Sequence, residues 1–238
     1  MVVEKHKKSL IMDRIIVLQS IILKKKAKNY LEVGVSNGAC FFNIAVKNKT
    51  AVDPAFVFGA KVKWKHKLIA FPRRIQYYDV TSDQFFEKQA KEKYDVVFLD
   101  GLHTYEQTYK DVVNALRFLK NDGIIVLHDC NPMNEYSAWP AKSREHMDEM
   151  FGDKWGHEWN GDVWKTIVKL RSAHPKLNVS VLDCDFGLGI VRKGQPDDRL
   201  NFSDEEIDKM TYQNLEKDRV KLLNLKPLSY FTEFINSL

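Results

Sequence analysis

The stretch KNYLEVGVSNG, residues 28–38 of this 238-residue chain, decides the fold. Its apolar residues 31–35 predict a strand, and the acid and glycines within it predict a tight turn. Residues 39–46 are expected to form a helix, and a second short strand ends in another acid, Asp53. A strand, a glycine turn, a helix and a second strand ending in an acid make up half of a nucleotide-binding unit. The stretch therefore predicts a site for a cofactor that contains adenosine.

Strand-like and helix-like patterns alternate outward from this stretch, as far as residue 192. The continuous apolar runs 94–99 and 124–127 predict buried parallel strands. Residues 179–182 and 188–191 predict a closing hairpin. The alternation predicts an α/β fold, namely a Rossmann-like, doubly wound, mainly parallel sheet with a C-terminal antiparallel hairpin.

Length and composition indicate one sizeable core, since 44% of the residues are hydrophobic. We expect an N-terminal helical extension over residues 1–28, a cofactor-binding domain over 29–192 and a C-terminal helical tail over 193–238. Residues 10–23 are apolar but carry two charges, and they are shorter than the roughly 20 residues that span a bilayer. We therefore expect no membrane span. The helix predicted here packs on the domain or on a second subunit, which would make a homodimer.

Charge and cysteine content narrow the class of protein further. The formal charge of +5 comes with lysine clusters at residues 5–8, 24–28 and 61–67. Such clusters could attract nucleic acid, acidic lipid headgroups or phosphorylated substrates, but a solvated lysine-rich face is the simpler interpretation. The cysteines are few, widely separated and without a CxxC pair, which fits a reducing cytoplasm and argues against a disulfide framework and against a cysteine zinc site. They are Cys40, Cys130 and Cys184.

Acidic side chains recur at the ends of the predicted strands, where an open parallel sheet binds its ligands. These residues are Glu32, Asp53, Asp79, Asp100 and Asp129. Asp100 and Asp129 both follow buried strands, so they should converge at one edge of the sheet. Two converging carboxylates near histidine and asparagine suit Mg²⁺ or Mn²⁺. The same acids could instead contact cofactor and substrate with no metal.

The glycine turn reads E-x-G-x-x-x-G, and it resembles motif I of the class I S-adenosylmethionine-dependent methyltransferases. It is not the GxGxxG motif of NAD-binding proteins, because Ser36 stands where that motif has glycine. The resemblance implies that the second acid, Asp53, grips the ribose hydroxyls and that Thr81 and Ser82 lie beside the adenine ring. The cofactor-binding residues implied in this way are Glu32, Gly34, Ser36, Gly38, Asp53, Thr81, Ser82 and Asp100.

Three further stretches are more specific. DGLHTYE at 100–106, HDCNP at 128–132 and WNGDVWK at 159–165 resemble the small-molecule O-methyltransferases of methyltransferase family 24. That group is distantly similar to the catechol and macrolide-sugar O-methyltransferases, and the resemblance covers about residues 28–192. It implies a metal site at Asp100 and Asp129. Catechol-type enzymes place asparagine directly after the second acid, whereas Cys130 and only then Asn131 follow here, so the third ligand stays open.

Methyl transfer from S-adenosylmethionine to a hydroxyl of a sugar or other small metabolite is the leading hypothesis. His103 is the candidate general base, because imidazole titrates near neutral pH, although it could equally be a helix cap. Asp100 would assist it, and a cation on Asp100 and Asp129 would lower the pKa of the hydroxyl. His128 is expected to be structural, Asp162 to be a helix cap, and Thr104 with Gln107 to form a capping box.

Two other classes of function stay open. One is N-methylation of an amino sugar or of RNA, and the other is a non-catalytic module that binds the cofactor or assembles with an enzyme. Nucleic acid ranks low, because apart from Trp64 the lysines lack the interleaved aromatic residues of a stacking platform. Acids at every expected strand end count against a non-catalytic module, which would not require Asp129.

Overall fold

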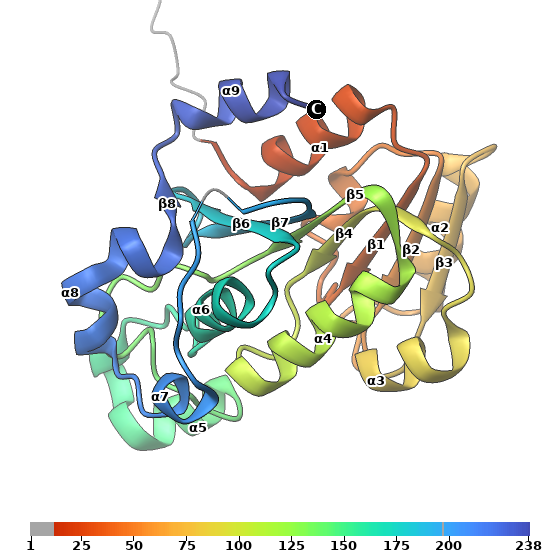
Figure 1. Cartoon of the computed structure of the whole chain (residues 1–238). Helices are drawn as coiled ribbons and strands as arrows, with labels where there is room; N and C mark the ends of the chain where they lie inside the picture. Colours follow the sequence, from red (N-terminus) through yellow and green to blue (C-terminus); the bar gives the residue numbers. More distant parts are fainter. Residues whose placement is uncertain (1–11, 197) are drawn as a thin grey trace, which may run out of the picture.

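The computed structural model describes residues 12–196 and 198–238, so the predicted lysine cluster at 5–8 lies outside the described residues. Its strands are β1 (Asn29–Val33), β2 (Asn48–Val52), β3 (Arg74–Tyr78), β4 (Tyr94–Leu99), β5 (Leu119–Leu127), β6 (Leu177–Leu182), β7 (Leu188–Lys193) and β8 (Leu225–Lys226). They form one eight-stranded sheet in the order β3-β2-β1-β4-β5-β7-β6-β8 (Figure 1).

The direction of the strands confirms the predicted fold class. The strands β3, β2, β1, β4 and β5 run parallel to their neighbours. Strand β7 runs antiparallel to both β5 and β6, which is the predicted hairpin. The central strand β4 is buried on both of its faces, as its continuous apolar sequence predicts for a parallel strand.

Helices cover both faces of the sheet, as Figure 1 shows. They are α1 (Arg14–Lys25), α2 (Ala60–Ala70), α3 (Ser82–Gln84), α4 (Tyr105–Phe118), α5 (Arg144–Phe151), α6 (Trp164–Ala173), α7 (Asp204–Asp208), α8 (Tyr212–Leu223) and α9 (Tyr230–Asn236). One apolar core lies between the sheet and the helices α4, α6, α7 and α8. A second core lies on the opposite face, under α1 and α9.

The helix predicted over residues 39–46 is not formed. The structure has only a 3₁₀ turn, η1 (Phe41–Asn43), between the glycine turn and β2. Nine residues, 39–47, are available for the return, and as an α-helix they would rise about 14 Å. A five-residue strand is about 17 Å long, so the chain must run in a more extended form to reach the start of β2. Within the segment, Phe41 and Ile44 still turn into the core.

The flanking segments pack on the central sheet. In α1, the residues Val17, Leu18, Ile21 and Ile22 are buried in the same core as Phe231 and its neighbours on α9. The tail also adds β8, which pairs with β6. The apolar face that suggested a second subunit is thus covered by the chain itself, and the homodimer and the three-part division stay predictions. Among the described residues, none of the helices combines the length and the apolar character required to cross a bilayer.

Candidate active site

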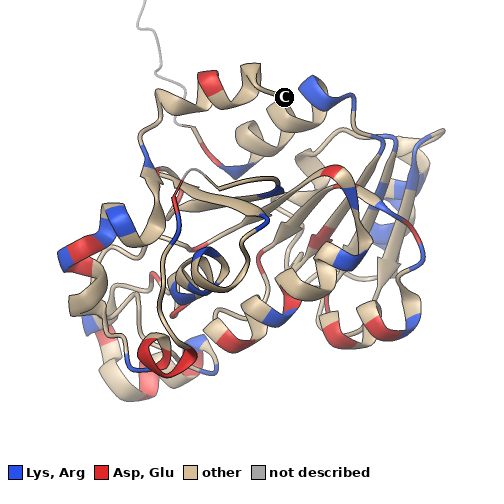
Figure 2. Cartoon of the chain, in the orientation of Figure 1, with Lys and Arg blue, Asp and Glu red and all other residues tan. Residues whose placement is uncertain are grey.

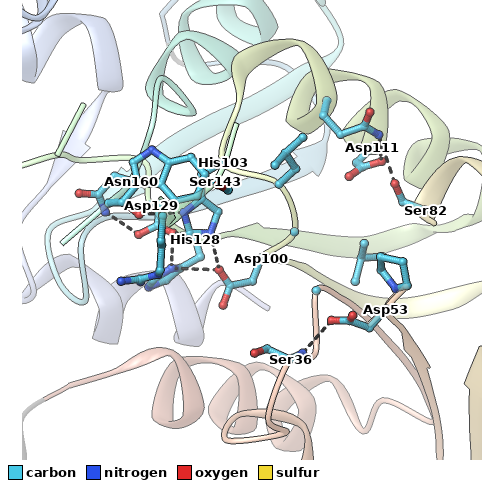
Figure 3. A pocket seen from close by; sticks show the side chains of 18 of the residues that line it. Ser36, Asp53, Ser82, Asp100, His103, Asp111, His128, Asp129, Ser143 and Asn160 are labelled. Carbon is cyan, nitrogen blue, oxygen red and sulfur yellow. Dashed lines mark hydrogen bonds and ion pairs between the residues drawn. The ribbon is translucent and has the colours of Figure 1, made fainter. Parts of the chain in front are cut away.

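A cavity of about 1020 Å³ lies at the carboxyl ends of β1, β2, β4 and β5 (Figure 3). This is the edge of the sheet at which the sequence predicted that the acids would converge. The predicted residues that line it are Gly34, Ser36, Asp53, Thr81, Ser82, Asp100, His103 and Asp129. The structure places Glu32 and Gly38 behind this wall. Glu32 accepts a hydrogen bond from the Tyr30 hydroxyl in the core, and Gly38 packs on the Phe42 ring.

The glycine turn brings β1 and β4 into backbone contact. Gly34 has a φ of +83°, and a Cβ added there would lie 2.0 Å from the carbonyl oxygen of Asp100. Only glycine tolerates both this φ and this approach. The turn therefore sets the distance between the end of β1 and the residues that follow β4.

Asp53 joins the loop that follows β1 to the loop that follows β2. One carboxylate oxygen accepts the Ser36 N–H at 2.7 Å, and the other accepts the Ala55 N–H at 2.7 Å. Each carboxylate oxygen can accept a second hydrogen bond, so the group retains capacity for two hydroxyl donors. This chemistry fits the ribose of an adenosine cofactor.

The end of the cavity beyond β3 contains polar residues that the sequence interpretation missed. Thr81 caps the short helix α3. Ser82 instead hydrogen-bonds Asp111, and Gln107 donates to both of them, at 3.2 Å to Ser82 and 3.0 Å to Asp111 (Figure 3). The predicted capping box of Thr104 and Gln107 is therefore not formed. The available signal was the i, i+4 spacing of Gln107 and Asp111, which puts both on one face of α4.

Burial in this pocket raises the pKa of Asp111 to about 6. Its carboxyl group is 3% exposed, and the hydrogen bonds from Ser82 and Gln107 only partly offset the cost of removing the charge from water. A buried, adjustable hydrogen-bonding group of this kind suits the edge of a purine base.

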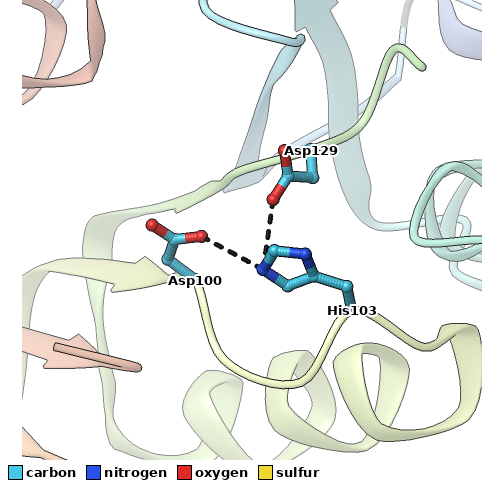
Figure 4. Close-up of side chains that lie close together, drawn as sticks. All are labelled: Asp100, His103 and Asp129. Carbon is cyan, nitrogen blue, oxygen red and sulfur yellow. Dashed lines mark ion pairs between the residues drawn. The ribbon is translucent and has the colours of Figure 1, made fainter. Parts of the chain in front are cut away.

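At the other end of the cavity, Asp100, His103 and Asp129 converge as the sequence predicted (Figure 4). The Nε2 atom of His103 lies 3.2 Å from Oδ2 of Asp129 and 3.6 Å from Oδ1 of Asp100. The two acids come from the ends of the neighbouring strands β4 and β5, and His103 comes from the loop between β4 and α4.

A backbone carbonyl fixes the tautomer of His103. Its Nδ1 lies 2.8 Å from the carbonyl oxygen of Trp159, which can only accept a hydrogen bond. Nδ1 therefore carries the proton, and the lone pair of the neutral ring sits on Nε2, facing the carboxylates. The lone pair and the carboxylates of Asp100 and Asp129 repel each other, so a proton or a metal cation on Nε2 would stabilise this arrangement.

Three residues that the sequence interpretation did not place in the site complete the cluster. His128 was expected to be structural, but its Nδ1 lies 2.9 Å from Asp129 and 3.2 Å from Asp100, without the alignment of a hydrogen bond. Arg14 on α1 bridges Asp100 at 2.9 Å and Asp185 at 2.8 Å. Asp185 lies in the turn between β6 and β7. The contacts of Arg14 join segments 86 and 171 residues apart, so no local pattern could have revealed them.

The charges of this cluster are balanced when both imidazoles are protonated, because three carboxylates then face one guanidinium and two imidazolium groups. Burial lowers the pKa of His103, but the carboxylates of Asp100 and Asp129 outweigh it and raise that pKa above its usual value. The same acids raise the pKa of His128 well above its usual value against burial. Burial raises the pKa of Asp100, yet His128 and His103 hold it well below the usual range.

The donor atoms of Asp100, His103 and Asp129 lie within 4.8 Å of one another and could hold a divalent cation. Asn131 does not join them. Its amide donates to Asp183 at 3.0 Å and accepts from Arg219, so it is fixed on the far side of the strand end. The amide near the acids is that of Asn160, whose Nδ2 lies 2.5 Å from Asp129. Two carboxylates and an imidazole suit Mn²⁺ better than Mg²⁺, which prefers oxygen ligands alone.

The long segment 131–161 forms the wall of the cavity opposite the strands. It has a small core of its own, formed by Ala141, Met147, Trp155 and Trp159. Trp159 donates its indole N–H to the Trp139 carbonyl at 3.0 Å and offers its own carbonyl to His103. The segment therefore holds the candidate base in place, and its tryptophans pack on one another.

Comparisons with known proteins agree with this geometry. Residues 31–130 match a family model described as a methyltransferase domain. No curated protein gives a significant match to the chain. The solved structures that resemble it share its fold at low identity. One is a candidate caffeoyl-CoA O-methyltransferase from Staphylococcus aureus, with a TM-score of 0.56 and 19% identity over 77% of this chain and 85% of that one.

A candidate O-methyltransferase from Klebsiella pneumoniae has a TM-score of 0.54 and 14% identity over 76% of this chain and 79% of that one. The S-adenosylhomocysteine-bound methyltransferase PaMTH1 from Podospora anserina has a TM-score of 0.52 and 15% identity, over 78% of this chain and 80% of that one. The matched residues 31–130 include the glycine turn, Asp53 and both acids of the cluster. Residues 31–130 of the chain thus match a methyltransferase domain, and the chain has the fold of solved methyltransferases.

Proposed function

We propose that this enzyme transfers the methyl group to a hydroxyl of a small molecule, such as a sugar or another hydroxylated metabolite. The observation that carries the proposal is the orientation of His103, whose Nδ1 lies 2.8 Å from the carbonyl oxygen of Trp159 and whose Nε2 lies 3.2 Å from Asp129 within the cavity. A histidine that is held by a carbonyl through one nitrogen, and whose other nitrogen lies beside carboxylates that stabilise its protonated form, has the geometry of a general base.

The cofactor would bind with its ribose on Asp53 and its adenine near Ser82. We assign its site to the predicted set Glu32, Gly34, Ser36, Gly38, Asp53, Thr81, Ser82 and Asp100, and we add Gln107 and Asp111 at the adenine edge. Glu32 and Gly38 would act from behind the wall by fixing the turn. When bound, S-adenosylmethionine supplies a methyl group that is already activated by the sulfonium.

In the reaction, a hydroxyl oxygen of the acceptor forms the new bond to the methyl carbon as the carbon–sulfur bond breaks. His103 takes the hydroxyl proton on Nε2, and Asp129 and Asp100 stabilise the imidazolium that results. Arg14 and His128 neutralise the remaining carboxylates, so that proton transfer to His103 leaves the cluster without excess charge.

In a second arrangement, Asp100 and Asp129 would hold the divalent cation that the sequence predicted there, with His103 as its third ligand, and the cation would lower the pKa of a bound hydroxyl. His103 cannot then be the base, because ligand and base use the same lone pair. Exhaustive chelation separates the two arrangements. We expect turnover to persist after chelation if His103 is the base, and to be lost and restored by Mn²⁺ if His103 is a ligand.

The His103→Ala variant tests the base directly. We expect kcat to fall by about 10²–10⁴-fold, the usual contribution of a general base. Because the pKa of His103 is raised and the base acts when deprotonated, the activity of the parent enzyme should rise with pH through a point above 6.5. That limb should disappear in the variant, while cofactor affinity measured by calorimetry stays within a few-fold.

An unchanged rate for His103→Ala across the pH range would reject this assignment. The acceptor is best found by mass spectrometry of products from a panel of hydroxylated metabolites that also contains amino sugars and RNA. A product methylated on nitrogen would favour the N-methyltransferase alternative. The three cysteines are free, which fits the cytoplasm that we assign as its location.

A further inference from the structure

The helix α2 contributes no buried side chain to the protein, although it carries large apolar residues. Trp64 is 66% exposed, Leu68 is 54% exposed, and Phe71 just after the helix is 81% exposed. Such residues are expected in a core or an interface, and exposed apolar clusters commonly mark sites of association. The packing of residues 12–196 and 198–238 does not account for them.

Three of the exposed apolar residues form one stripe on the outer face of the helix, and the exposed Ile69 lies beside it. Trp64, Leu68 and Phe71 are spaced i, i+4, i+7, which places them above one another along the helix. The inner face is fixed by other contacts. His66 stacks on the Phe42 ring at 3.7 Å, and Lys63 lies 4.0 Å above the ring of Phe56. The orientation of α2 is thus set, and its apolar stripe points away from the protein.

Cations surround this stripe. Residues 59–74 contain four lysines and two arginines but no acid, and Figure 2 shows these charges along α2. Among the described residues, Lys61, Lys65 and Lys67 form no ion pair, whereas Lys63 is paired with Asp79. The local charge is therefore uncompensated on the side that carries the apolar stripe.

We propose that this face of α2 docks on an anionic lipid bilayer. Trp64, Leu68 and Phe71 enter the headgroup region, and Lys61, Lys65 and Lys67 lie against the lipid phosphates. A lysine-rich helix with Trp, Phe and Leu on its outer stripe has the composition of helices that lie in the plane of a membrane surface. The proposal goes beyond methyl transfer and does not depend on it.

Two other occupants fit the surface less well. The core of a protein–protein interface is depleted in lysine, whereas here lysines flank every turn of the stripe. Single-stranded RNA binds through aromatic rings on which its bases stack, and Leu68 and Ile69 offer none. Charge alone favoured a solvated lysine face, and the exposed apolar stripe is the feature that selects a membrane.

Co-sedimentation with vesicles tests the proposal on the full chain. We expect binding to vesicles of equal parts phosphatidylcholine and phosphatidylglycerol, little binding to phosphatidylcholine alone, and weakening with added salt. A lysine near an anionic surface contributes roughly fivefold to affinity, so the triple variant Lys61→Gln, Lys65→Gln, Lys67→Gln should bind on the order of 100-fold more weakly. The triple variant Trp64→Ser, Leu68→Ser, Phe71→Ser should lose at least about tenfold.

A matched control lies on α8, where Lys217 and Val220 are also exposed. The variant Lys217→Gln, Val220→Ser should bind as the parent does. A second measurement locates the contact. Brominated lipids should quench tryptophan fluorescence in the parent, and Trp64→Phe should lose most of that quenching while it keeps its affinity.

Equal binding by the parent and both triple variants would overturn the proposal. It would also be overturned if uncharged vesicles bound as well as anionic ones. Polyuridylic acid provides the test for RNA. The face would be assigned to RNA instead if polyuridylic acid displaced the protein from vesicles, if this displacement required the same three lysines, and if the serine variant behaved as the parent does. Because none of these residues lines the cavity, loss of vesicle binding should leave methyl transfer intact.

Discussion

The carboxyl group of Glu32 lies in the core, 1% exposed, where the Tyr30 hydroxyl donates to it at 2.5 Å. Burial raises the pKa of Glu32 to about 8, and the charge of Asp100 raises it further, while the bond from Tyr30 opposes the shift. At pH 7 the group is therefore largely protonated. Its position behind the glycine turn explains why an acid here need not touch the cofactor.

The Glu32→Gln variant tests this protonation state. A carboxyl whose pKa is raised on folding binds its proton more tightly in the folded state. The free energy of unfolding of the parent protein therefore falls as pH rises from about 4.5 to 8. That shift corresponds to roughly 5 kcal/mol in the free energy of unfolding. We expect the variant to match the parent near pH 5 and to exceed it above pH 8, in urea unfolding at each pH. Parallel pH profiles for the two proteins would contradict the assignment.

Gly161 is the second residue whose backbone shapes the site. It has a φ of +63°, and a Cβ there would lie 1.7 Å from the carbonyl oxygen of His103. Trp159, which orients His103, is two residues away. The glycine therefore allows the segment 131–161 to lie directly against His103, the candidate base.

The Gly161→Ala variant should push this segment away from His103. A displacement of about 1 Å at a catalytic group costs on the order of 100-fold in rate, and we expect that loss in kcat. Gly156→Ala is the matched control, because Gly156 also has a positive φ, +67°, but has nothing within 4 Å of its added Cβ. The control should lose only about 1–2 kcal/mol from backbone strain and keep its rate. Equal losses of rate in both variants would show that strain, not contact, is responsible.

Residue by residue, the sequence predicted the parts of the site that follow a periodic element. Asp53, Asp100 and Asp129 end buried strands, and parallel strands bring their ends together whatever the details of packing. Arg14 and Asp185 could not be found in this way, because their approach depends on how α1 and the β6–β7 turn dock on the sheet.

At the scale of elements, the segment 131–161 behaves as a small unit packed on the larger fold. Trp155 is 2% exposed in its core and donates its indole N–H to Asp148 at 2.9 Å. This core is separate from the two cores of the sheet, so its stability should be separable as well.

The Trp155→Ala variant should loosen this segment without unfolding the sheet. Truncation of a buried tryptophan lowers stability by about 3–5 kcal/mol, and we expect this loss to affect the segment 131–161 alone. We expect proteolytic cleavage within 131–161, a higher KM and a lower kcat, with the main thermal transition little changed. Met150→Ala on the exposed side of α5 is the control and should resist cleavage as the parent does. A single cooperative loss of all structure in Trp155→Ala would refute the separate unit.

The helix that the sequence wrongly predicted over residues 39–46 is absent because of a length constraint. Residues 39–46 have an acceptable helical composition, and a local pattern cannot measure the distance back to the start of β2. The strands β4 and β5 could be predicted because burial on both faces leaves a continuous apolar sequence. An error of this kind is expected wherever the geometry of a connection overrides local preference.

At the scale of the whole molecule, α1 is the first described helix, and its contacts join it to the edge of the sheet that carries the candidate site. Its apolar side packs with α9, and its first residue, Arg14, reaches both Asp100 after β4 and Asp185 between β6 and β7. The backbone N–H of Arg14 also donates to Asp185 at 2.8 Å, so this acid lies at the positive end of the helix. One side chain thus joins three distant parts of the chain.

The Arg14→Met variant should therefore weaken the entire fold as well as the site. It keeps the length of the side chain but leaves two largely buried carboxylates without their cation, which should lower the free energy of unfolding by roughly 3 kcal/mol. Arg74→Met is the matched control, since its ion pair with Glu92 has the same 2.8 Å length but its side chain is 56% exposed. Exposed pairs contribute at most about 1 kcal/mol. If the two variants lost equal stability in urea unfolding, Arg14 would be an ordinary surface residue, and the neutral cluster that we infer around His103 would lack its fixed cation.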